Sequence, residues 1–228
     1  MKLFLLRHGQ TDWNLQGRIQ GQTDIPLNYA GKGMALKAAA ALRDIPFDRA
    51  YCSSLTRTRE TLDPVLKGRG TPVFYRDLLK EISFGEDEGV TFEEIKAHRE
   101  WSVAGFFFTP ASYVPRTGAE SVGALRARAR AFLDELSLSC RHLNNVLAVT
   151  HGAFTHATIC EVCNLPDARF WESRKMRNCS VTVVELKDGH WSMEREAVDL
   201  LGGENPLAAL SPELYGHQGA GMMKTTFP

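Results

Sequence analysis

Two histidine-glycine pairs stand at the ends of short apolar runs that have the length of buried strands. Arg7-His8-Gly9 follows the run at residues 3–6, and His151-Gly152 follows the run at residues 146–149. In an open parallel sheet, ligands bind beyond the carboxyl ends of the strands. We therefore expect both histidines at the ligand-binding edge of a sheet.

A third segment, residues 53–59, follows another apolar run and brings Arg57 to the same edge. Arginine offers a planar fork of donors and stays charged, so two arginines can offset a phosphate dianion without a metal. A neutral imidazole can attack phosphorus, and a second one can donate a hydrogen bond to a phosphoryl oxygen. Arg7, His8, Arg57 and His151 together therefore indicate phosphoryl chemistry, and the glycine after each histidine should let a ligand approach the backbone closely.

Strand-like and helix-like patterns alternate along the chain. We expect strands at 3–6, 50–52, 73–75 and 146–149, a hairpin of 180–186 with 191–195, and helices at 28–42, 54–66, 91–100, 121–138 and 153–163. The expected helix caps are Asn28, Ser53 or Ser54, and Glu120 with Ser121. Repeated strand-then-helix order predicts an α/β fold: a three-layer sandwich with a mostly parallel central sheet and helices on both faces.

Six short blocks occur along residues 1–195 in one order. They are Arg7-His8-Gly9-Gln10-Thr11 with Asn14, Arg18, Gln20-Gly21 and 24–27; Ser53 through Arg57 to Thr61; Glu81-Ile82-Ser83-Phe84-Gly85 with Gly89; Gly118-Ala119-Glu120-Ser121; His151-Gly152; and Asn178-Cys179-Ser180-Val181-Thr182. This ordered set resembles the histidine phosphatase superfamily, the phosphoglycerate mutase-like proteins, and within it the phosphatase branch. A single Arg-His-Gly would be weak evidence, whereas six ordered blocks are specific.

The resemblance implies a role for each matching position. His8 would be the nucleophile that becomes phosphorylated, and Glu81 would donate a proton to the leaving oxygen. The remaining catalytic residues would be Arg7, Arg57 and His151, and the additional phosphate or substrate contacts would be Asn14, Arg18 and Gly152. Residue types alone do not single out Glu81, because acidic residues are common.

The family blocks also suggest how the chain is divided. Residues 1–200 are expected to form one histidine phosphatase domain with an aromatic-rich insert at about 90–117, and residues 201–228 a C-terminal tail rich in Gly and Pro. The insert could be a lid over the substrate or could only build its own core. Both alternatives are open from the sequence.

Composition limits the partners and the compartment. Lys plus Arg and Asp plus Glu both count 27, so the neutral chain has no whole-molecule attraction for nucleic acid or an anionic membrane. The expected partner is a small phosphomonoester; the oligomeric state is open, and a homodimer is compatible with the sequence. The N-terminal apolar run is too short for a signal peptide, no stretch has the length of a membrane span, and five cysteines without framework spacing suit reduced thiols. We therefore expect a cytoplasmic protein.

No metal or other cofactor is expected. His151 and His156 are five apart and do not share a helix face, so they are a poor zinc pair. Cys52 followed by Arg57 resembles the loop of a cysteine phosphatase, but one intervening residue is missing. Neither feature competes with His8, the nucleophile that the resemblance implies.

The predicted activity is metal-independent hydrolysis of small phosphomonoesters through a phosphohistidine on His8. Two alternatives stay open: a cofactor-dependent phosphoglycerate mutase and a phosphoprotein-directed regulatory phosphatase. The resemblance implies a longer, proline-rich insert for mutases, and this insert has only the isolated Pro110 and Pro115, which favours hydrolysis. The aromatic residues of the insert leave the alternative of a phosphoprotein substrate open.

Overall fold

The computed structural model describes residues 1–202, and its centre is a six-stranded sheet with the strand order β3-β2-β4-β1-β5-β6. The first four strands in the chain run parallel, whereas β5 and β6 are antiparallel. The expected hairpin joins those last two through Asp188 and Gly189, which both have positive φ as a tight hairpin turn requires. The strands are β1 Lys2–Arg7, β2 Arg49–Cys52, β3 Val73–Tyr75, β4 Asn145–Thr150, β5 Ser180–Lys187 and β6 His190–Asp199.

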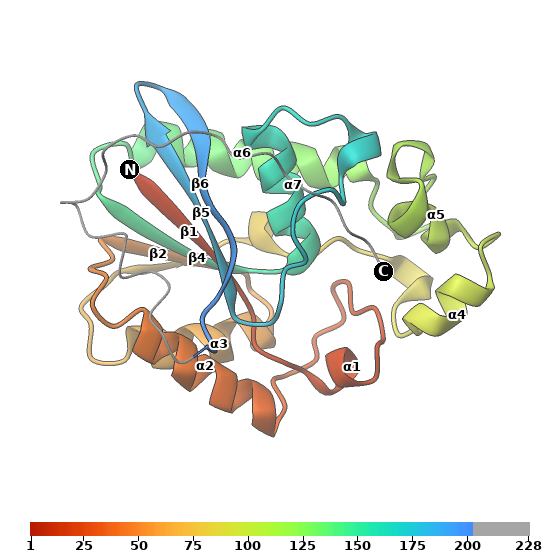
Figure 1. The fold of residues 1–228 in the computed structure, drawn as a ribbon, viewed down its shortest axis with the longest axis horizontal. Coiled ribbons are helices and arrows are strands. Elements are labelled where there is room, and N and C mark those ends of the chain that lie inside the picture. Colours follow the sequence, from red (N-terminus) through yellow and green to blue (C-terminus); the bar gives the residue numbers. More distant parts are fainter. Residues whose placement is uncertain (203–228) are drawn as a thin grey trace.

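Helices cover both faces of the sheet (Figure 1). On one face lie α2 (Tyr29–Ala41) and α3 (Thr56–Leu66), and on the other lie α6 (Val122–Ser139) and α7 (Gly152–Val162). Successive side chains of β1 point to opposite faces, so Leu3 and Leu5 join the core beside α6 and α7, whereas Phe4 and Leu6 join the core beside α2 and α3. The predicted three-layer α/β sandwich with a mostly parallel sheet is confirmed.

The aromatic insert contains two short helices, α4 (Phe92–Ala97) and α5 (Ser102–Phe108). Phe106 is fully buried, and its ring contacts those of Phe84, Tyr113, Phe170 and Trp171. The Trp171 indole also donates a hydrogen bond to the Phe106 carbonyl at 2.8 Å. This packing favours an insert that builds a core over an insert that acts as a lid. The core of the insert continues into the core of the sandwich.

The remaining elements are short. They are α1 (Asp12–Leu15) and the 3₁₀ turns η1 (Asp77–Leu79), η2 (Gly85–Asp87), η3 (Pro110–Ser112) and η4 (Asp167–Arg169). No helix within residues 1–202 is long and apolar enough to cross a bilayer. Most of the predicted tail, residues 203–228, lies outside the described residues, and the domain boundary near 200 stays a prediction.

Helix N-caps were predicted for α2, α3 and α6, and the structure confirms a predicted cap residue for α2 and α6. Asn28 caps α2 and Ser121 caps α6. The cap predicted for α3 at Ser53 or Ser54 is wrong: the N-cap position is Leu55, and it makes no side-chain cap bond. Instead Asp24, from a distant loop, accepts hydrogen bonds from the backbone N–H and the hydroxyl of Thr56, both at 2.7 Å. A carboxylate at this end also matches the positive end of the helix dipole.

Candidate active site

The structure brings the two predicted histidines together. Arg7 at the end of β1 is the register partner of Thr150 at the end of β4, so His8 and His151 leave the sheet side by side at the same edge. Their ring centroids are 5.2 Å apart. Both side chains are almost fully buried.

The His8 ring is oriented by the backbone carbonyl of the next residue, Gly9. Its Nδ1 lies 2.7 Å from the Gly9 carbonyl oxygen, so Nδ1 carries the proton and donates, which leaves the lone pair on Nε2. Burial, with the charges of Arg57 and Arg7, lowers the pKa of His8 well below its ordinary value of 6.5. His8 is therefore a neutral imidazole at neutral pH, with one ring nitrogen available as a nucleophile.

His151 is held by two partners. Arg57 Nε donates to His151 Nδ1 at 3.3 Å, so the proton lies on Nε2, which is 2.9 Å from the Ser53 hydroxyl oxygen. Burial, and after it the charges of Arg57, His8 and Arg7, lowers the pKa of His151 well below 6.5. A neutral His151 can donate a hydrogen bond from Nε2. Sequence reasoning assigned Ser53 to a helix cap and missed this contact, although Ser53 stands in the same block as Arg57.

Arg57 reaches the site from the first turn of α3 and is fully buried. Its Nη1 donates to the Thr23 carbonyl at 2.9 Å and its Nη2 to the Gly21 carbonyl at 2.7 Å. Burial lowers the pKa of Arg57 to about 10, so the guanidinium keeps its charge at neutral pH. Three of its five N–H groups are engaged in these bonds and in the bond to His151, and the others can bind an anion.

Arg7 has a buried N–H donor, on Nε, that a ligand could engage. One terminal nitrogen donates to the Met176 carbonyl, but the buried Nε has no hydrogen-bond partner among residues 1–202. A Cβ added to Gly152 would lie 3.6 Å from this Nε and 3.8 Å from Glu81 Oε2. Gly152 therefore borders the space beside Arg7. An anion there would satisfy the unpaired donor, whose burial is otherwise costly.

Glu81 lies at the N-terminus of α7. Its Oε2 accepts a hydrogen bond from the Ala153 N–H, and its Oε1 accepts from the N–H groups of Phe154 and Ile82, all at 3.1 Å. The first N–H groups of a helix have no intrahelical acceptor, and they favour an oxygen ligand. The structure thus places the predicted proton donor in the same site as Arg7 and Gly152.

Asn14 is oriented through its carbonyl oxygen. Its Oδ1 accepts from the Thr11 N–H at 3.2 Å and from Asn178 Nδ2 at 3.1 Å, which fixes the amide plane and leaves the NH₂ group as a donor. Asn178 Nδ2 also donates to the carbonyls of His8 and Gly9. Asn178 therefore ties Asn14 to the loop that carries His8. No role was assigned to Asn178 from the sequence, although it lies in the sixth block.

Arg18 stands apart from the other predicted residues. Its Nη1 donates to the Gly89 carbonyl at 2.6 Å and its Nε to Gln16 at 2.9 Å, and the side chain is exposed. Within residues 1–202, no hydrogen bond or ion pair joins Arg18 to the other predicted site residues. Its role as a substrate contact stays a prediction.

The glycine after His8 is required by packing, a reason that the sequence did not show. A Cβ on Gly9 would lie 2.7 Å from the Gly31 carbonyl oxygen in α2, and a Cβ on Gly31 would lie 2.0 Å from the Gln10 carbonyl oxygen. Both contacts are far below the normal separation. At Gly9 the absence of a side chain is thus required by close packing of the loop on α2, and the close approach of a ligand stays a prediction.

Glu88 is a second residue that sequence reasoning left without a definite role. Its carboxylate accepts hydrogen bonds from the N–H groups of Gln22 at 2.9 Å, Thr23 at 2.7 Å and Phe84 at 3.1 Å. It thereby holds the loop whose Gly21 and Thr23 carbonyls hold Arg57. The signal for it was the Glu-Gly pair at 88–89, which fits the third block.

Neither a cysteine nucleophile nor a metal site competes with the two histidines within the described residues. Cys52 is buried, and burial raises the pKa of its thiol to about 12, so it is not a thiolate nucleophile at neutral pH. In the part of the chain that the structure describes, no group of three or more His, Cys, Asp or Glu side chains could hold a metal ion. The chemistry-bearing residues that do converge are two neutral histidines, two arginines and one carboxylate.

The lowered pKa of buried His156 predicts how the stability of the protein depends on pH. Burial lowers the pKa of His156 to about 3, whereas an unfolded histidine titrates near 6.5. Between these values the unfolded chain binds the extra proton, so acid lowers the free energy of unfolding. In His156→Gln, this free energy should fall less steeply from pH 6 to pH 4.5, by up to about 1.4 kcal/mol per pH unit. Urea titrations at several pH values measure the slope. The exposed His190→Gln variant is the control, and a wild-type slope in His156→Gln would contradict the prediction.

Comparison with known proteins agrees with this geometry. The family model of the histidine phosphatase superfamily (branch 1) matches residues 3–199. The "Probable phosphoglycerate mutase GpmB" of Shigella dysenteriae is 28% identical over 215 residues, covering 92% of this chain and 96% of that protein. Among solved structures, Bacillus stearothermophilus YhfR has a TM-score of 0.79 and 30% identity, covering 86% of this chain and 96% of its own.

A second solved structure is a mycobacterial glucosyl-3-phosphoglycerate phosphatase in complex with VO3, with a TM-score of 0.77 and 28% identity over 86% of this chain and 98% of that one. The prediction of a phosphoric monoester hydrolase is confirmed at the level of the family. The chain belongs to the histidine phosphatase superfamily, branch 1.

Proposed function

We propose that this protein is a metal-independent phosphatase that hydrolyses small phosphomonoesters through a phosphohistidine on His8. One observation carries the proposal: His8 is buried, neutral and hydrogen-bonded through Nδ1, so that Nε2 is the free nucleophile, under the influence of the charges of buried Arg57 and of Arg7. The arginines supply the positive charge that a metal supplies in other phosphatases.

In the first step the substrate phosphate occupies the space bounded by Arg7, Arg57 and His151. The unpaired Nε of Arg7 and the remaining N–H groups of Arg57 bind its oxygens, and His151 Nε2 turns from Ser53 to donate to another. His8 Nε2 then attacks phosphorus, and the bond to the leaving oxygen breaks. Protonated Glu81 gives its proton to that oxygen, so that the product leaves as an alcohol.

In the second step water takes the place of the alcohol. Glu81, now a carboxylate, removes a proton from the water as the water oxygen attacks the phosphorus of phosphohistidine. The P–N bond breaks, and the electron pair returns to His8 Nε2. Inorganic phosphate leaves, His8 is again neutral, and Glu81 is again protonated.

The mutase alternative differs only in the acceptor of the phosphoryl group. A mutase returns it to a bound phosphoglycerate, whereas a phosphatase gives it to water. The Shigella relative is named a probable phosphoglycerate mutase, and the solved structures include a phosphatase, so one experiment should measure both activities. The packed, continuous core of the insert gives no direct support to a phosphoprotein substrate.

The test measures the fate of the phosphoryl group. Purified protein is incubated in EDTA with a panel of phosphomonoesters and, separately, with 3-phosphoglycerate and its bisphosphate primer. We expect inorganic phosphate to be released at an undiminished rate in chelator, and far faster than the phosphoglycerate isomers interconvert.

Two results would contradict the proposal. Activity that disappears in EDTA and returns with magnesium or zinc would mean that a metal supplies the charge. Isomer interconversion faster than phosphate release would establish the mutase activity instead.

A further inference from the structure

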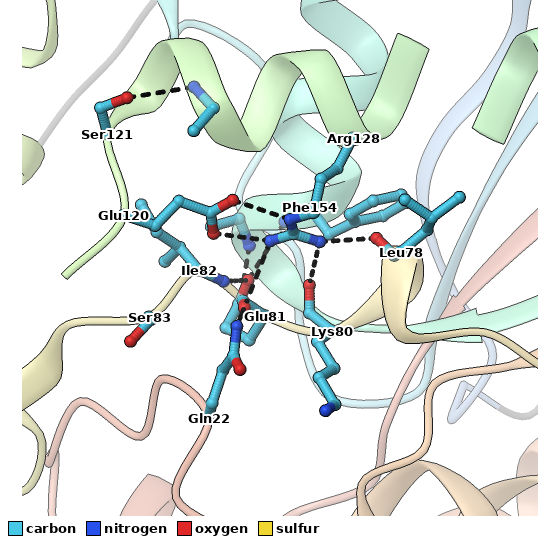
Figure 2. Close-up of polar contacts among 12 residues, drawn as sticks. Gln22, Leu78, Lys80, Glu81, Ile82, Ser83, Glu120, Ser121, Arg128 and Phe154 are labelled. Carbon is cyan, nitrogen blue, oxygen red and sulfur yellow. Dashed lines mark hydrogen bonds and ion pairs between the residues drawn. The ribbon is translucent and has the colours of Figure 1, made fainter. Parts of the chain in front are cut away.

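Arg128 on α6 is the centre of a polar network around the backbone of the candidate proton donor, Glu81 (Figure 2). Its guanidinium binds the Glu120 carboxylate through Nε and Nη2, both at 2.7 Å. The cap predicted at Glu120 is therefore wrong: Ser121 caps the helix, and Glu120 instead neutralises an arginine two turns further along. A bidentate pair of this kind fixes the plane of the guanidinium.

The remaining donors of Arg128 hold the backbone around Glu81. Its Nη1 donates to the carbonyls of Leu78 at 2.5 Å and Lys80 at 2.9 Å, and its Nη2 lies 3.4 Å from the carbonyl of Glu81 itself (Figure 2). Gln22 also donates to the Glu81 carbonyl, at 3.1 Å. The segment from η1 to Glu81 belongs to no strand, so side chains serve here as the donors that a neighbouring strand would provide.

The same arginine also contacts a residue that binds the Glu81 carboxylate. The Arg128 guanidinium lies 5.7 Å from the ring centroid of Phe154, and the Phe154 N–H donates to Glu81 Oε1. Arg128 thus contacts both the residue that carries the carboxylate and a residue that binds it. A shift of either contact would move the carboxylate relative to the leaving oxygen.

We infer that Arg128 is a positioning residue that sets where Glu81 presents its proton. The inference rests on the proposed function, in which Glu81 protonates the leaving oxygen. A group misplaced by about 1 Å can cost a large part of its catalytic effect. The loss should fall on substrates that need protonation, because phosphoryl transfer to His8 itself depends on Arg7 and Arg57.

The experiment compares two substrates in the full-length protein. Glycerol 3-phosphate has a poor leaving group that needs a proton, whereas 4-nitrophenyl phosphate needs little protonation. For Arg128→Gln we expect kcat to fall about 10- to 30-fold with glycerol 3-phosphate and less than about threefold with 4-nitrophenyl phosphate. In Arg128→Lys, which keeps the charge and part of the donor set, the ratio of the two rates should recover partly.

Arg126→Gln is the matched control. Arg126 lies on the same helix, is 16% exposed against 19% for Arg128, and also pairs with carboxylates, those of Glu161 and Asp167, but it makes no contact with the Glu81 segment. It should leave the ratio of the two rates unchanged. If Arg128→Gln does not fold, Arg128→Lys and Glu120→Gln carry the same comparison.

Combination with Glu81→Gln separates the inference from the proposed function. In that background Arg128→Gln should not change the ratio further, because the proton donor is already gone. A further drop in the double variant, or the same ratio in Arg128→Gln as in Arg126→Gln, would overturn the inference and leave the role of Glu81 intact. An unchanged ratio in Glu81→Gln alone would overturn the acid role in the proposed function, and the inference with it.

Discussion

His8→Ala is expected to lower kcat/KM by roughly 10⁴-fold or more for every phosphomonoester that the protein hydrolyses. His8 Nε2 is the free nitrogen of a neutral ring, because Nδ1 is bonded to the Gly9 carbonyl and burial with two arginines lowers the pKa of the ring. Without it, water would have to attack the ester directly. Steady-state kinetics with 4-nitrophenyl phosphate and with an alkyl phosphate measure the loss.

The control for this variant is His142→Ala, which removes an exposed histidine and should leave kcat/KM unchanged. Thermal unfolding of His8→Ala shows whether the fold is kept, since His8 is only 2% exposed. A folded His8→Ala protein that retains more than about a tenth of the wild-type kcat/KM would contradict the role of His8 as nucleophile.

Glu81→Gln is expected to slow turnover by roughly a hundredfold or more for substrates with poor leaving groups, and much less for 4-nitrophenyl phosphate. The proposed mechanism needs a proton donor at the leaving oxygen, so the wild-type rate should fall on the alkaline side. His8 keeps its lone pair well into acid because its pKa is lowered, which gives a neutral or mildly acidic optimum. Glutamine does not titrate, so Glu81→Gln should lose the alkaline fall.

Rates with both substrates from pH 4.5 to pH 9 measure this prediction. Glu86→Gln is the control, because Glu86 is an exposed acid in the loop that follows and lies 3.9 Å from Arg116. If Glu81→Gln slowed both substrates equally and kept the wild-type pH profile, Glu81 would not be the acid. Its position at the N-terminus of α7 would then be structural.

The sandwich could be predicted because each strand and helix has a local signal. The apolar run before Arg7 and the one before Thr150 mark β1 and β4, and Asn28 marks the start of α2. The start of α3 could not be found locally, because the N–H and the hydroxyl of its first residue, Thr56, bind Asp24, thirty-two residues away in the chain. Ser53, which looked like the cap, has its hydroxyl beside His151 instead.

The residues of the site also divide into those with a local sequence signal and those placed by distant contacts. Arg7, His8, Arg57 and His151 could be placed at one edge of the sheet because strand ends alone determine their position. Glu81 was accessible only through resemblance, since its position depends on the N-terminus of a helix seventy residues further along. Glu88, Asn178 and Arg128 act through backbone carbonyls and N–H groups of distant loops, and no spacing in the sequence reports such contacts.

The phosphohistidine mechanism is tested most directly by finding the phosphoryl group on the enzyme. Wild-type protein is mixed with 4-nitrophenyl phosphate in EDTA, quenched within milliseconds in alkali, where phosphohistidine survives better than in acid, and digested for mass spectrometry. We expect one acid-labile phosphoryl group, on His8, which is absent from His8→Ala. Phosphate on Cys52 or on a serine, or no phosphoenzyme while 4-nitrophenol is released in a burst ahead of inorganic phosphate, would contradict it.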